Sequence, residues 1–309
     1  MTDSTAGRRA GRGRGLSLRS ILRASRPISW PNTAGPFAAG AFVAGASLRA
    51  GHNLLGTLYF TLPYNLALYG INDVCDYESD RLNPRKDSVE GGLLPPETHR
   101  PVLGLIAALN APLLATLLAR GDRRAAGVLG FLMVTTVAYS APPLRLKEVP
   151  GLDACISATH FVTPFVYGLA LNRAASYPAR EIAAYTAWCM ASQAFGAIQD
   201  VEVDRAAGSG SVATAIGPRP TALLATALYL GAAALLLLAR GGTRLARAKR
   251  LAGALTILPY ATNAALLLRD PRPERANRHW RAFLGLNLVA GAALTVTLLW
   301  GRTKYRPFG

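Results

Sequence analysis

Cysteine and acidic residues are scarce in this sequence. Its three cysteines in 309 residues form no C-x-x-C pair, which excludes a disulfide-stapled scaffold. Charged residues make up only 17% of the chain, below the roughly 25% of an average soluble domain. Since 51% of the residues are hydrophobic and the mean hydropathy is +0.23, intrinsic disorder is excluded as well. The composition indicates a polytopic membrane protein.

Basic residues outnumber acidic ones, 34 against 17, which gives a formal net charge of +17. In a soluble protein such an excess would suggest nucleic-acid binding. Here the Lys and Arg residues lie in the N-terminal segment and in the breaks between apolar runs, and no aromatic residues alternate with them to stack on bases. We therefore expect contact with membrane lipid and no nucleic-acid partner.

Three regions differ in composition. Residues 1–26 are rich in Gly and Arg, and we expect a disordered basic arm at the membrane surface. No apolar segment of the signal-peptide type follows, so a cleaved signal is not expected. Residues 27–303 are expected to form one all-α transmembrane domain, and residues 304–309 a short C-terminal tail.

Apolar runs long enough for transmembrane helices recur along the chain, since a span needs about 20 mainly apolar residues. About nine candidates lie near 33–50, 53–71, 101–119, 125–140, 152–171, 181–199, 221–239, 251–268 and 282–300. Prolines inside several of them predict kinks. The pattern predicts a bundle of transmembrane helices.

The distribution of Lys and Arg favours a cytoplasmic N-terminus only weakly, because the excess comes from the N-terminal segment. The order of the spans along the chain says more about which loops share a membrane face. The loops after the second and the sixth span both follow an even-numbered span, so they must lie at the same face of the membrane.

These two loops hold most of the acidic residues. One window reads N-D-V-C-D-Y-E-S-D-R from Asn72 to Arg81, and the other reads Q-D-V-E-V-D-R from Gln199 to Arg205. Both contain D-x-x-x-D-R. Residues four apart share a helix face, so each window predicts a stripe of oxygen ligands. The first stripe consists of Asn72, Asp76 and Asp80, with Asp73 beside it. The second stripe consists of Asp200 and Asp204.

Carboxylates this close repel one another unless a cation neutralises them. Mg²⁺ is held by one or two carboxylates and by phosphate oxygens, so two facing stripes predict a metal–diphosphate clamp. The alternative is that helix-end carboxylates pair with loop Arg and Lys. For one stripe alone this alternative is as plausible, and the repetition at one face favours the clamp.

Basic residues accompany the acidic ones. Arg81, Arg85 and Lys86 follow the first stripe, and Arg145 and Lys147 lie in the loop after the fourth span, again at the same face. Arg suits bidentate phosphate contacts and Lys acts as a point charge. Each could alternatively bind lipid head groups. The four histidines show no pair at metal-ligand spacing, and His160, in the middle of a span, is expected to be a buried, hydrogen-bonded side chain.

The two acidic windows and the Y-S-x-P-P-x-R-x-K loop at 139–147 together resemble the UbiA superfamily of intramembrane prenyltransferases. The resemblance implies nine spans around a cavity and Mg²⁺-dependent transfer of a prenyl group from a diphosphate. It implies the following roles: metal ligands Asp73, Asp76, Asp80, Asp200 and Asp204; diphosphate contacts Asn72, Arg81, Arg85, Lys86 and Arg145; and catalytic groups Lys147 and Tyr139 together with Asp73, Asp76 and Asp200.

Within that superfamily, the segments 25–37, 69–86, 89–95 and 199–207 are similar to bacterial lycopene elongases of C50 carotenoid pathways. This implies dimethylallyl diphosphate as donor and lycopene, or another lipophilic molecule, as acceptor. It also implies a plasma-membrane location with the site facing the cytoplasm and a downstream carotenoid cyclase as partner. Two alternatives remain open: an aromatic prenyltransferase for a quinone or chromophore precursor, and a cation transporter.

Overall fold

The computed structural model describes residues 16–81, 92–239 and 242–300, and within these residues every regular element is a helix. The α-helices are α1 (Leu18–Ala24), α2 (Pro31–Val43), α3 (Gly51–Thr61), α4 (Pro63–Cys75), α5 (Tyr77–Asp80), α6 (Pro96–Arg120), α7 (Arg123–Ser140), α8 (Leu152–Leu171), α9 (Ala179–Ala197), α10 (Val201–Ala207), α11 (Val212–Ile216), α12 (Pro218–Leu237), α13 (Arg244–Leu266) and α14 (Pro273–Leu299). Three 3-10 helices connect them: η1 (Pro27–Ser29), η2 (Leu146–Glu148) and η3 (Ile198–Asp200).

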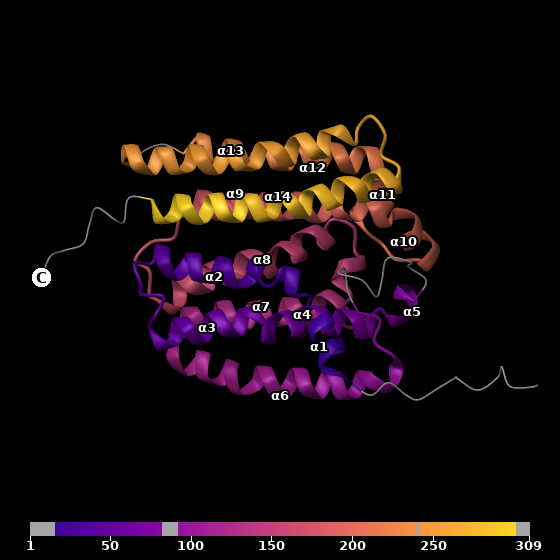
Figure 1. Ribbon diagram of the computed structural model, residues 1–309, viewed down its shortest axis with the longest axis horizontal. Coiled ribbons are helices and arrows are strands. Elements are labelled where there is room, and N and C mark those ends of the chain that lie inside the picture. The colour runs from indigo at the N-terminus through magenta and orange to yellow at the C-terminus, as the bar shows by residue number, and fades with distance from the viewer. Residues whose placement is uncertain (1–15, 82–91, 240–241, 301–309) are drawn as a thin grey trace, which may run out of the picture.

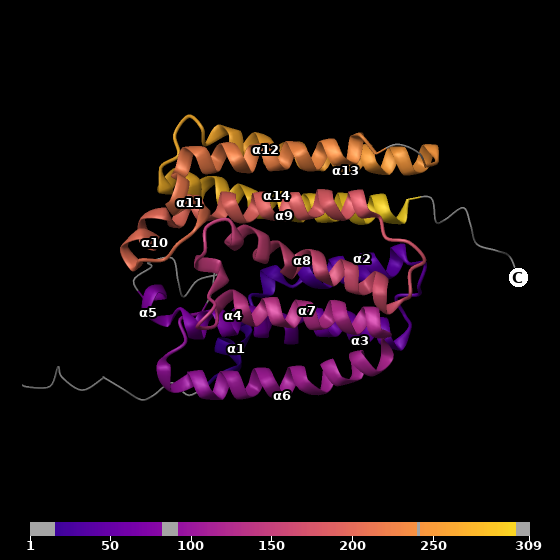
Figure 2. The ribbon, with the colours of Figure 1, turned by 180° about the vertical axis from the view of Figure 1, so that it is seen from behind.

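The long helices run nearly parallel to one another in stacked rows (Figures 1 and 2). Helices α12 and α13 form one outer row, followed by α9 with α14 and then by α2 with α8; α3, α4 and α7 come next, and α6 covers the opposite side. The contacts agree, since α12 packs against α9 and α13, and α8 packs against α2, α7 and α9. The short helices α5, α10 and α11 gather at one end of the bundle, which we call the acidic end. The prediction that the two acidic windows share a face is therefore confirmed.

Two of the predicted spans are divided or end early. The span near 53–71 is divided into α3 and α4 at Leu62, because Pro63 has no amide hydrogen to continue the helix. The span near 33–50 ends at Val43, where Gly45 adopts a left-handed conformation (φ +82°) that commonly terminates helices.

Among the described residues, four helices are long and apolar enough to cross a membrane by length and composition, namely α6, α8, α12 and α14. The expected number of nine spans therefore stays a prediction. The surface of α14 has the character of a lipid-facing helix: Leu288, Val289 and Val296 are all about two-thirds exposed, and the most apolar window of this helix is only 6% buried. Lipid-exposed helices need such apolar exteriors because lipid tails offer no hydrogen bonds.

Helices α2 and α8 cross at backbone contact. A Cβ atom at Gly40 would lie 2.1 Å from the carbonyl oxygen of Phe165, and one at Gly168 would lie 2.3 Å from that of Phe37. Small residues allow this approach, as is common between helices in membranes. The contact fixes α2 against α8, which together form one wall of the cavity described below.

The described part of the expected N-terminal arm is folded, contrary to our prediction of disorder up to residue 26. Residues 18–24 form α1, which begins with a capping box between Ser17 and Ser20. Ala24 is completely buried and belongs to a cluster with Leu66 and Leu94. The leucines and isoleucine among the arginines give this segment an apolar face, which the Gly/Arg-rich composition obscured. The rest of the arm, residues 1–15, and the expected tail at 304–309 lie outside the described residues.

Candidate active site

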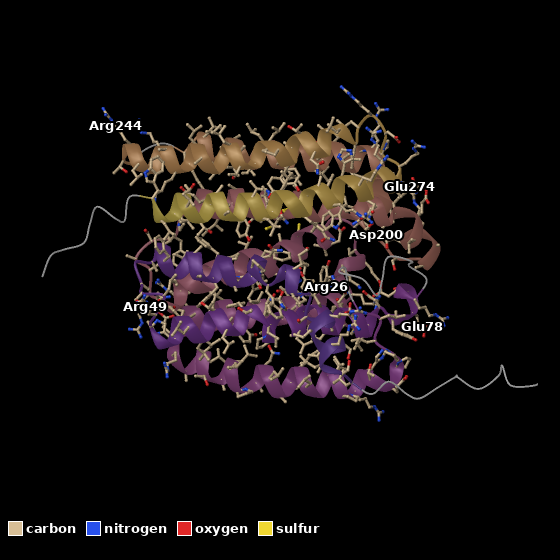
Figure 3. The ribbon with its side chains drawn as sticks, viewed as in Figure 1. Arg26, Arg49, Glu78, Asp200, Arg244 and Glu274 are labelled. Atoms are coloured by element: carbon tan, nitrogen blue, oxygen red, sulfur yellow. The ribbon has the colours of Figure 1, made fainter. Side chains whose placement is uncertain are left out.

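A cavity of about 1090 Å³ lies between α2, α8, α9, α13 and α14. At the acidic end its wall contains Asp76, Asp80, Asp200 and Asp204, which come from the two predicted stripes. Asp200 lies at this end in Figure 3, whereas Arg49 and Arg244 mark the opposite end. Two segments separated by more than 100 residues thus present four carboxylates to one space.

The first stripe lies on a helix that is interrupted but keeps its hydrogen bonds. Helix α4 ends at Cys75, and Asp76 has φ −104° and ψ 4° before α5 begins. The amide of Asp76 still donates to the Asn72 carbonyl at 2.9 Å, and the amide of Asp80 donates to the Asp76 carbonyl at 2.8 Å. The predicted alignment of residues four apart is therefore retained across the break.

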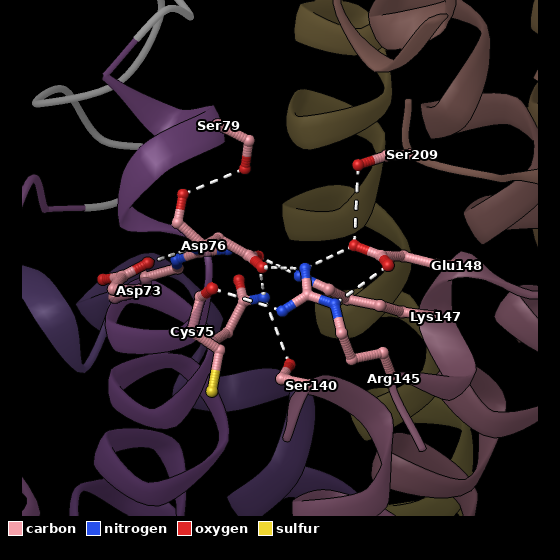
Figure 4. A network of polar contacts seen from close by, with 11 residues as sticks. Asp73, Cys75, Asp76, Ser79, Ser140, Arg145, Lys147, Glu148 and Ser209 are labelled. Carbon is pink, nitrogen blue, oxygen red and sulfur yellow. Dashed lines mark hydrogen bonds and ion pairs between the residues drawn. The ribbon is translucent and has the colours of Figure 1, made fainter. Parts of the chain in front are cut away.

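Asp76 is the centre of a charged network at the cavity wall (Figure 4). Arg145 Nη2 donates to Asp76 Oδ1 at 3.1 Å, and Lys147 Nζ forms an ion pair with Asp76 Oδ2. The side-chain nitrogen Nδ2 of Asn72 also donates to Asp76 Oδ2, at 2.5 Å, and to Ser140 Oγ, at 3.2 Å. Four of the predicted site residues are thus brought together, although they come from separate segments of the chain.

Glu148 extends this network, and no sequence motif singled it out. Arg145 Nε donates to Glu148 Oε2 at 2.9 Å, and Ser209 Oγ lies 3.5 Å from Glu148 Oε1. The hydrogen bond from Arg145 lowers the pKa of Glu148, and the same contact raises the pKa of Arg145. Arg145 therefore forms ion pairs with both Asp76 and Glu148 and keeps its positive charge.

Asp73, unlike Asp76 and Asp80, is not among the described residues that line the cavity. It is 1% exposed, accepts a hydrogen bond from Arg26 Nη2 at 3.0 Å and accepts another from the Gly92 amide at 3.3 Å. Arg26 also lies over the ring of Tyr69, 4.3 Å from its centroid. The metal-ligand role of Asp73 stays a prediction, since its carboxylate is bonded to an arginine here.

Sequence reasoning missed Arg26. Its side chain is only 17% exposed and lines the cavity. Nothing in the spacing distinguishes it from the other arginines of residues 1–26, but it precedes Pro27 and lies close to Trp30, so it already belongs to an apolar context.

The second stripe follows the end of α9. Helix α9 continues as the 3-10 helix η3, and α10 begins at Val201, so Asp200 and Asp204 lie at this junction. A residue of α14 stabilises this junction, since Asn277 Nδ2 donates to Gln199 Oε1 at 2.7 Å. Buried Asp153, at the start of α8, accepts a hydrogen bond from the Val212 amide at 3.0 Å and so ties α8 to α11.

The four other predicted residues differ in their positions. Tyr139 lines the cavity, with its ring edge-on to that of His160 at 5.0 Å between centroids. Arg81 is largely exposed and pairs with Glu78 at 3.0 Å. Arg85 and Lys86 lie outside the described residues. The binding roles of all the basic residues stay predictions.

The donors fit Mg²⁺ in one particular way. No group of three or more His, Cys, Asp or Glu side chains among the described residues is close enough to enclose a metal ion. The four cavity-lining aspartates nevertheless offer hard oxygen ligands from two sides. Mg²⁺ is commonly held by one or two carboxylates together with water and substrate phosphates rather than by a protein cage. The donor set therefore fits a metal that binds together with a diphosphate.

Away from the acidic end, the cavity is lined by aromatic side chains that the sequence did not single out. Trp188 stacks on Phe283 with centroids 6.0 Å apart and meets Tyr260 edge-on at 5.3 Å, and Trp280 stacks on Phe283 at 4.6 Å. These rings come from α9, α13 and α14, and their spacing along the sequence resembles that of ordinary core residues. The cavity thus combines an acidic end with a long aromatic interior.

A helical bundle whose cavity has an acidic end and an aromatic interior fits the class of intramembrane prenyltransferases. The chain belongs to the UbiA prenyltransferase family, whose profile matches residues 33–295. It is a prenyltransferase and an integral membrane protein, as predicted, and a cation transporter is not supported.

Several curated relatives are similar over most of the chain. A lycopene elongase/hydratase from Corynebacterium glutamicum is 42% identical over 286 residues, which is 91% of this chain and 97% of that protein. The C(50) beta-cyclic carotenoids biosynthesis protein LbtBC from Dietzia sp. is 42% identical over 92% of this chain and 65% of its own length. The resemblance to lycopene elongases is therefore confirmed.

Solved structures show the same fold. A UbiA homolog from Archaeoglobus fulgidus bound to DMAPP and Mg²⁺ superposes with a TM-score of 0.66 at 23% identity, covering 90% of this chain and 99% of that one. An apo UbiA homolog from Aeropyrum pernix K1 gives a TM-score of 0.64 at 20% identity, covering 92% and 100%. The all-helical UbiA architecture expected from the sequence is confirmed.

Proposed function

We propose that this prenyltransferase moves a dimethylallyl group from dimethylallyl diphosphate to the end of lycopene, with Mg²⁺ as cofactor. One observation carries the proposal: the carboxylates and the cations Arg145 and Lys147 meet at one end of a cavity whose wall is otherwise mostly apolar and holds a cluster of aromatic rings. A charged small donor suits the first part, and a long hydrocarbon suits the second. The names of the relatives from Corynebacterium glutamicum and Dietzia sp. support this acceptor class.

The diphosphate would bind between the two stripes. Asp76, Asp80, Asp200 and Asp204 would hold Mg²⁺, which when bound neutralises diphosphate charge and stabilises the leaving group. Arg145 and Lys147 already lie against Asp76, so they are placed to contact diphosphate oxygens beside the metal. Asn72 would orient Asp76 through its amide. Fixed cations near developing negative charge act as electrostatic catalysts.

The chemistry has two bond changes. The C–O bond of the donor breaks and its electron pair goes to a diphosphate oxygen, which leaves a dimethylallyl cation. The electrons of the terminal double bond of lycopene then form the new C–C bond, which leaves a tertiary cation on the carotenoid. Loss of a proton or capture of water ends the reaction, and the name elongase/hydratase of the relative from Corynebacterium glutamicum favours water.

The aromatic interior serves the acceptor. Trp188, Tyr260 and Phe283 give the polyene an apolar surface and exclude bulk water from the cation. Helix α14, which borders the cavity, has 27 residues and is therefore about 40 Å long, so an extended carotenoid can lie along it. We propose entry of the acceptor from the bilayer, because a hydrocarbon of this size partitions into lipid.

The cellular setting is also a proposal. We infer that the site faces the cytoplasm across the plasma membrane, since the donor is a charged, water-soluble molecule and must reach the acidic end from an aqueous compartment. A carotenoid cyclase would act on the product as a downstream partner.

The proposal is tested with membranes that contain lycopene and the expressed chain, supplied with labelled dimethylallyl diphosphate. We expect label in elongated carotenoids when Mg²⁺ is present and none in excess chelator. The variants Asp76→Asn and Asp200→Asn should lose elongation, whereas Glu274→Gln, which removes an exposed carboxylate at the same end, should keep it.

Two results would contradict the proposal. Label that enters an aromatic quinone precursor and never the carotenoid would replace the acceptor by that of the alternative prenyltransferase. Full turnover in excess chelator would remove the metal from the mechanism.

A further inference from the structure

A second pocket, of about 390 Å³, lies between α13 and α14. Its described wall consists of Asn263, Arg275, Arg278, His279 and Ala282. None of these five is among the described residues that line the active-site cavity. Glu274, the residue before Arg275, lies at the acidic end in Figure 3, so the pocket lies near this end of the bundle. Two arginines at the wall of one pocket suit a phosphate or another anion.

Carboxylates leave much of the charge of the two arginines available. Asp270 accepts two hydrogen bonds of 2.8 Å from Arg272, whereas Arg275 Nη1 lies 3.7 Å from the same carboxylate. In the part of the chain that the structure describes, no carboxylate lies within ion-pair distance of Arg278. The side chain of Arg275 is 40% exposed and Arg278 is exposed as well, so a ligand can reach both. Both residues lie in the first two turns of α14, where the helix dipole also favours an anion.

Hydrogen bonds between the two helices fix the wall of the pocket. Asn263 Nδ2 on α13 donates to the His279 carbonyl at 2.9 Å, and Asn263 Oδ1 lies 2.7 Å from His279 Nδ1. Because an amide oxygen can only accept, His279 Nδ1 is the donor in the second bond. The pocket is therefore formed before a ligand arrives, which lowers the entropy cost of binding.

An exposed apolar stripe continues from the pocket along α14. Residues seven apart lie on nearly the same side of a helix, so the line from Arg275 passes through Ala282, Val289 and Val296, which we call the α14 stripe. Val289 is 68% exposed and Val296 is 69% exposed. The described residues of α14 that line the active-site cavity, such as Phe283, lie on another side of the helix. Helix α14 lies in front of α9 in Figure 1 and behind it in Figure 2, which places it at the outside of the bundle.

We propose that the pocket and the α14 stripe bind an anionic phospholipid, whose phosphate contacts Arg275 and Arg278 while one acyl chain lies along the stripe. A phosphate group joined to an apolar chain matches the order of charged and apolar residues on α14. A free phosphate would use the pocket and leave the stripe uncovered. Basic pockets between transmembrane helices are a recurring site for anionic lipid head groups. Binding of this lipid does not depend on which prenyl acceptor the active-site cavity takes.

Native mass spectrometry of the purified full chain in detergent tests the proposal, because it counts bound lipid directly. The protein is titrated with phosphatidylglycerol and with phosphatidylcholine, and a further series adds inorganic phosphate as competitor. The test variant is Arg275→Gln/Arg278→Gln. The matched control is Arg244→Gln/Arg247→Gln, which removes two exposed arginines, with the same spacing, at the opposite end of the bundle. Arg278→Gln changes only an exposed side chain and decides the question if the double variant does not fold.

We expect wild type and the control to prefer phosphatidylglycerol. The test variant should bind this lipid about tenfold more weakly or worse, and Arg278→Gln should fall between it and wild type. Equal affinity of wild type for the two lipids overturns the proposal, as does unchanged affinity in the folded test variant or in Arg278→Gln. An equal loss in the control also overturns it, since diffuse surface charge would then explain the binding. Displacement of the lipid by inorganic phosphate at matching concentration would make the pocket a free-phosphate site and would overturn the lipid assignment.

Discussion

Arg145 and Asp76 form an ion pair of 3.1 Å although 69 residues separate them in the sequence. The guanidinium reaches Asp76 because Arg145 adopts a left-handed conformation (φ 39°) at the start of η2. Its other nitrogens contact the Cys75 carbonyl and Glu148, so the side chain is held in place from three directions. A cation fixed in this way need not reorganise when a diphosphate arrives.

Removal of this fixed charge should impair the chemical step. We expect Arg145→Gln and Lys147→Gln each to lower kcat by about 100-fold or more, the range typical for loss of one electrostatic stabiliser. Arg145→Lys should recover little, because an ammonium cannot reproduce the fork of hydrogen bonds. Single-turnover assays with labelled donor provide the measurement. Arg244→Gln, an exposed charge at the opposite end, is the control and should behave as wild type.

The crossing of α2 and α8 should be sensitive to a single methyl group. Gly40→Ala is expected to destabilise the protein by about 1–3 kcal/mol through overpacking, because its Cβ would lie 2.1 Å from the Phe165 carbonyl oxygen. Gly35→Ala on the same helix is the matched control, since nothing lies within 4 Å of its Cβ. Thermal unfolding in detergent measures both. Equal melting temperatures for the two variants would show that α2 and α8 do not touch as described.

Stability should fall in acid through Glu148. Because Arg145 lowers the pKa of Glu148 in the folded protein, the unfolded chain takes up the proton first as pH falls. The stabilising contribution is thus complete above the ordinary pKa of Glu and is lost as pH falls through the lowered pKa. We expect Glu148→Gln to have a shallower loss of melting temperature with acid than wild type. Glu274→Gln, which removes an exposed carboxylate, is the control and should keep the wild-type slope, and a wild-type slope in Glu148→Gln would contradict the prediction.

Cysteine labelling can determine which way the site faces. Cys155 is exposed near the start of α8 at the acidic end, whereas Cys189 is buried. In a Cys75→Ala/Cys189→Ala variant, we expect a membrane-impermeant maleimide to modify Cys155 in inside-out vesicles and not in sealed right-side-out cells. The reverse pattern would place the acidic end outside the cytoplasm. Cys189 alone, in the Cys75→Ala/Cys155→Ala variant, should stay unmodified in both preparations.

The sequence predicted the acidic end well because the underlying rules are local. Spacing of four residues places Asn72, Asp76 and Asp80 along one side of a helix, and the amide bonds of Asp76 and Asp80 confirm it despite the break at Cys75. Parity of the spans then placed the two stripes at one end of the bundle. Both arguments need only the helix period and the order of apolar runs.

Other parts of the site could not be predicted from local patterns. Asp73 and Asp76 are three residues apart, yet one contacts Arg26 and the other contacts Arg145 and Lys147. The rotation of α4 about its axis decides between them, and that rotation depends on packing with remote helices. In the same way, Trp188 and Phe283 resemble core residues until α9 and α14 are brought together around the cavity.

The sequence by itself determined that this chain is a helical membrane protein of the prenyltransferase class with paired aspartate turns at one face, because hydrophobic length, helical period and motif spacing are properties of neighbouring residues. Only the tertiary structure decided which carboxylates line the cavity and that Arg26 is buried beside Asp73. Those features depend on contacts between segments that are distant in sequence, and the packing of whole helices sets such contacts.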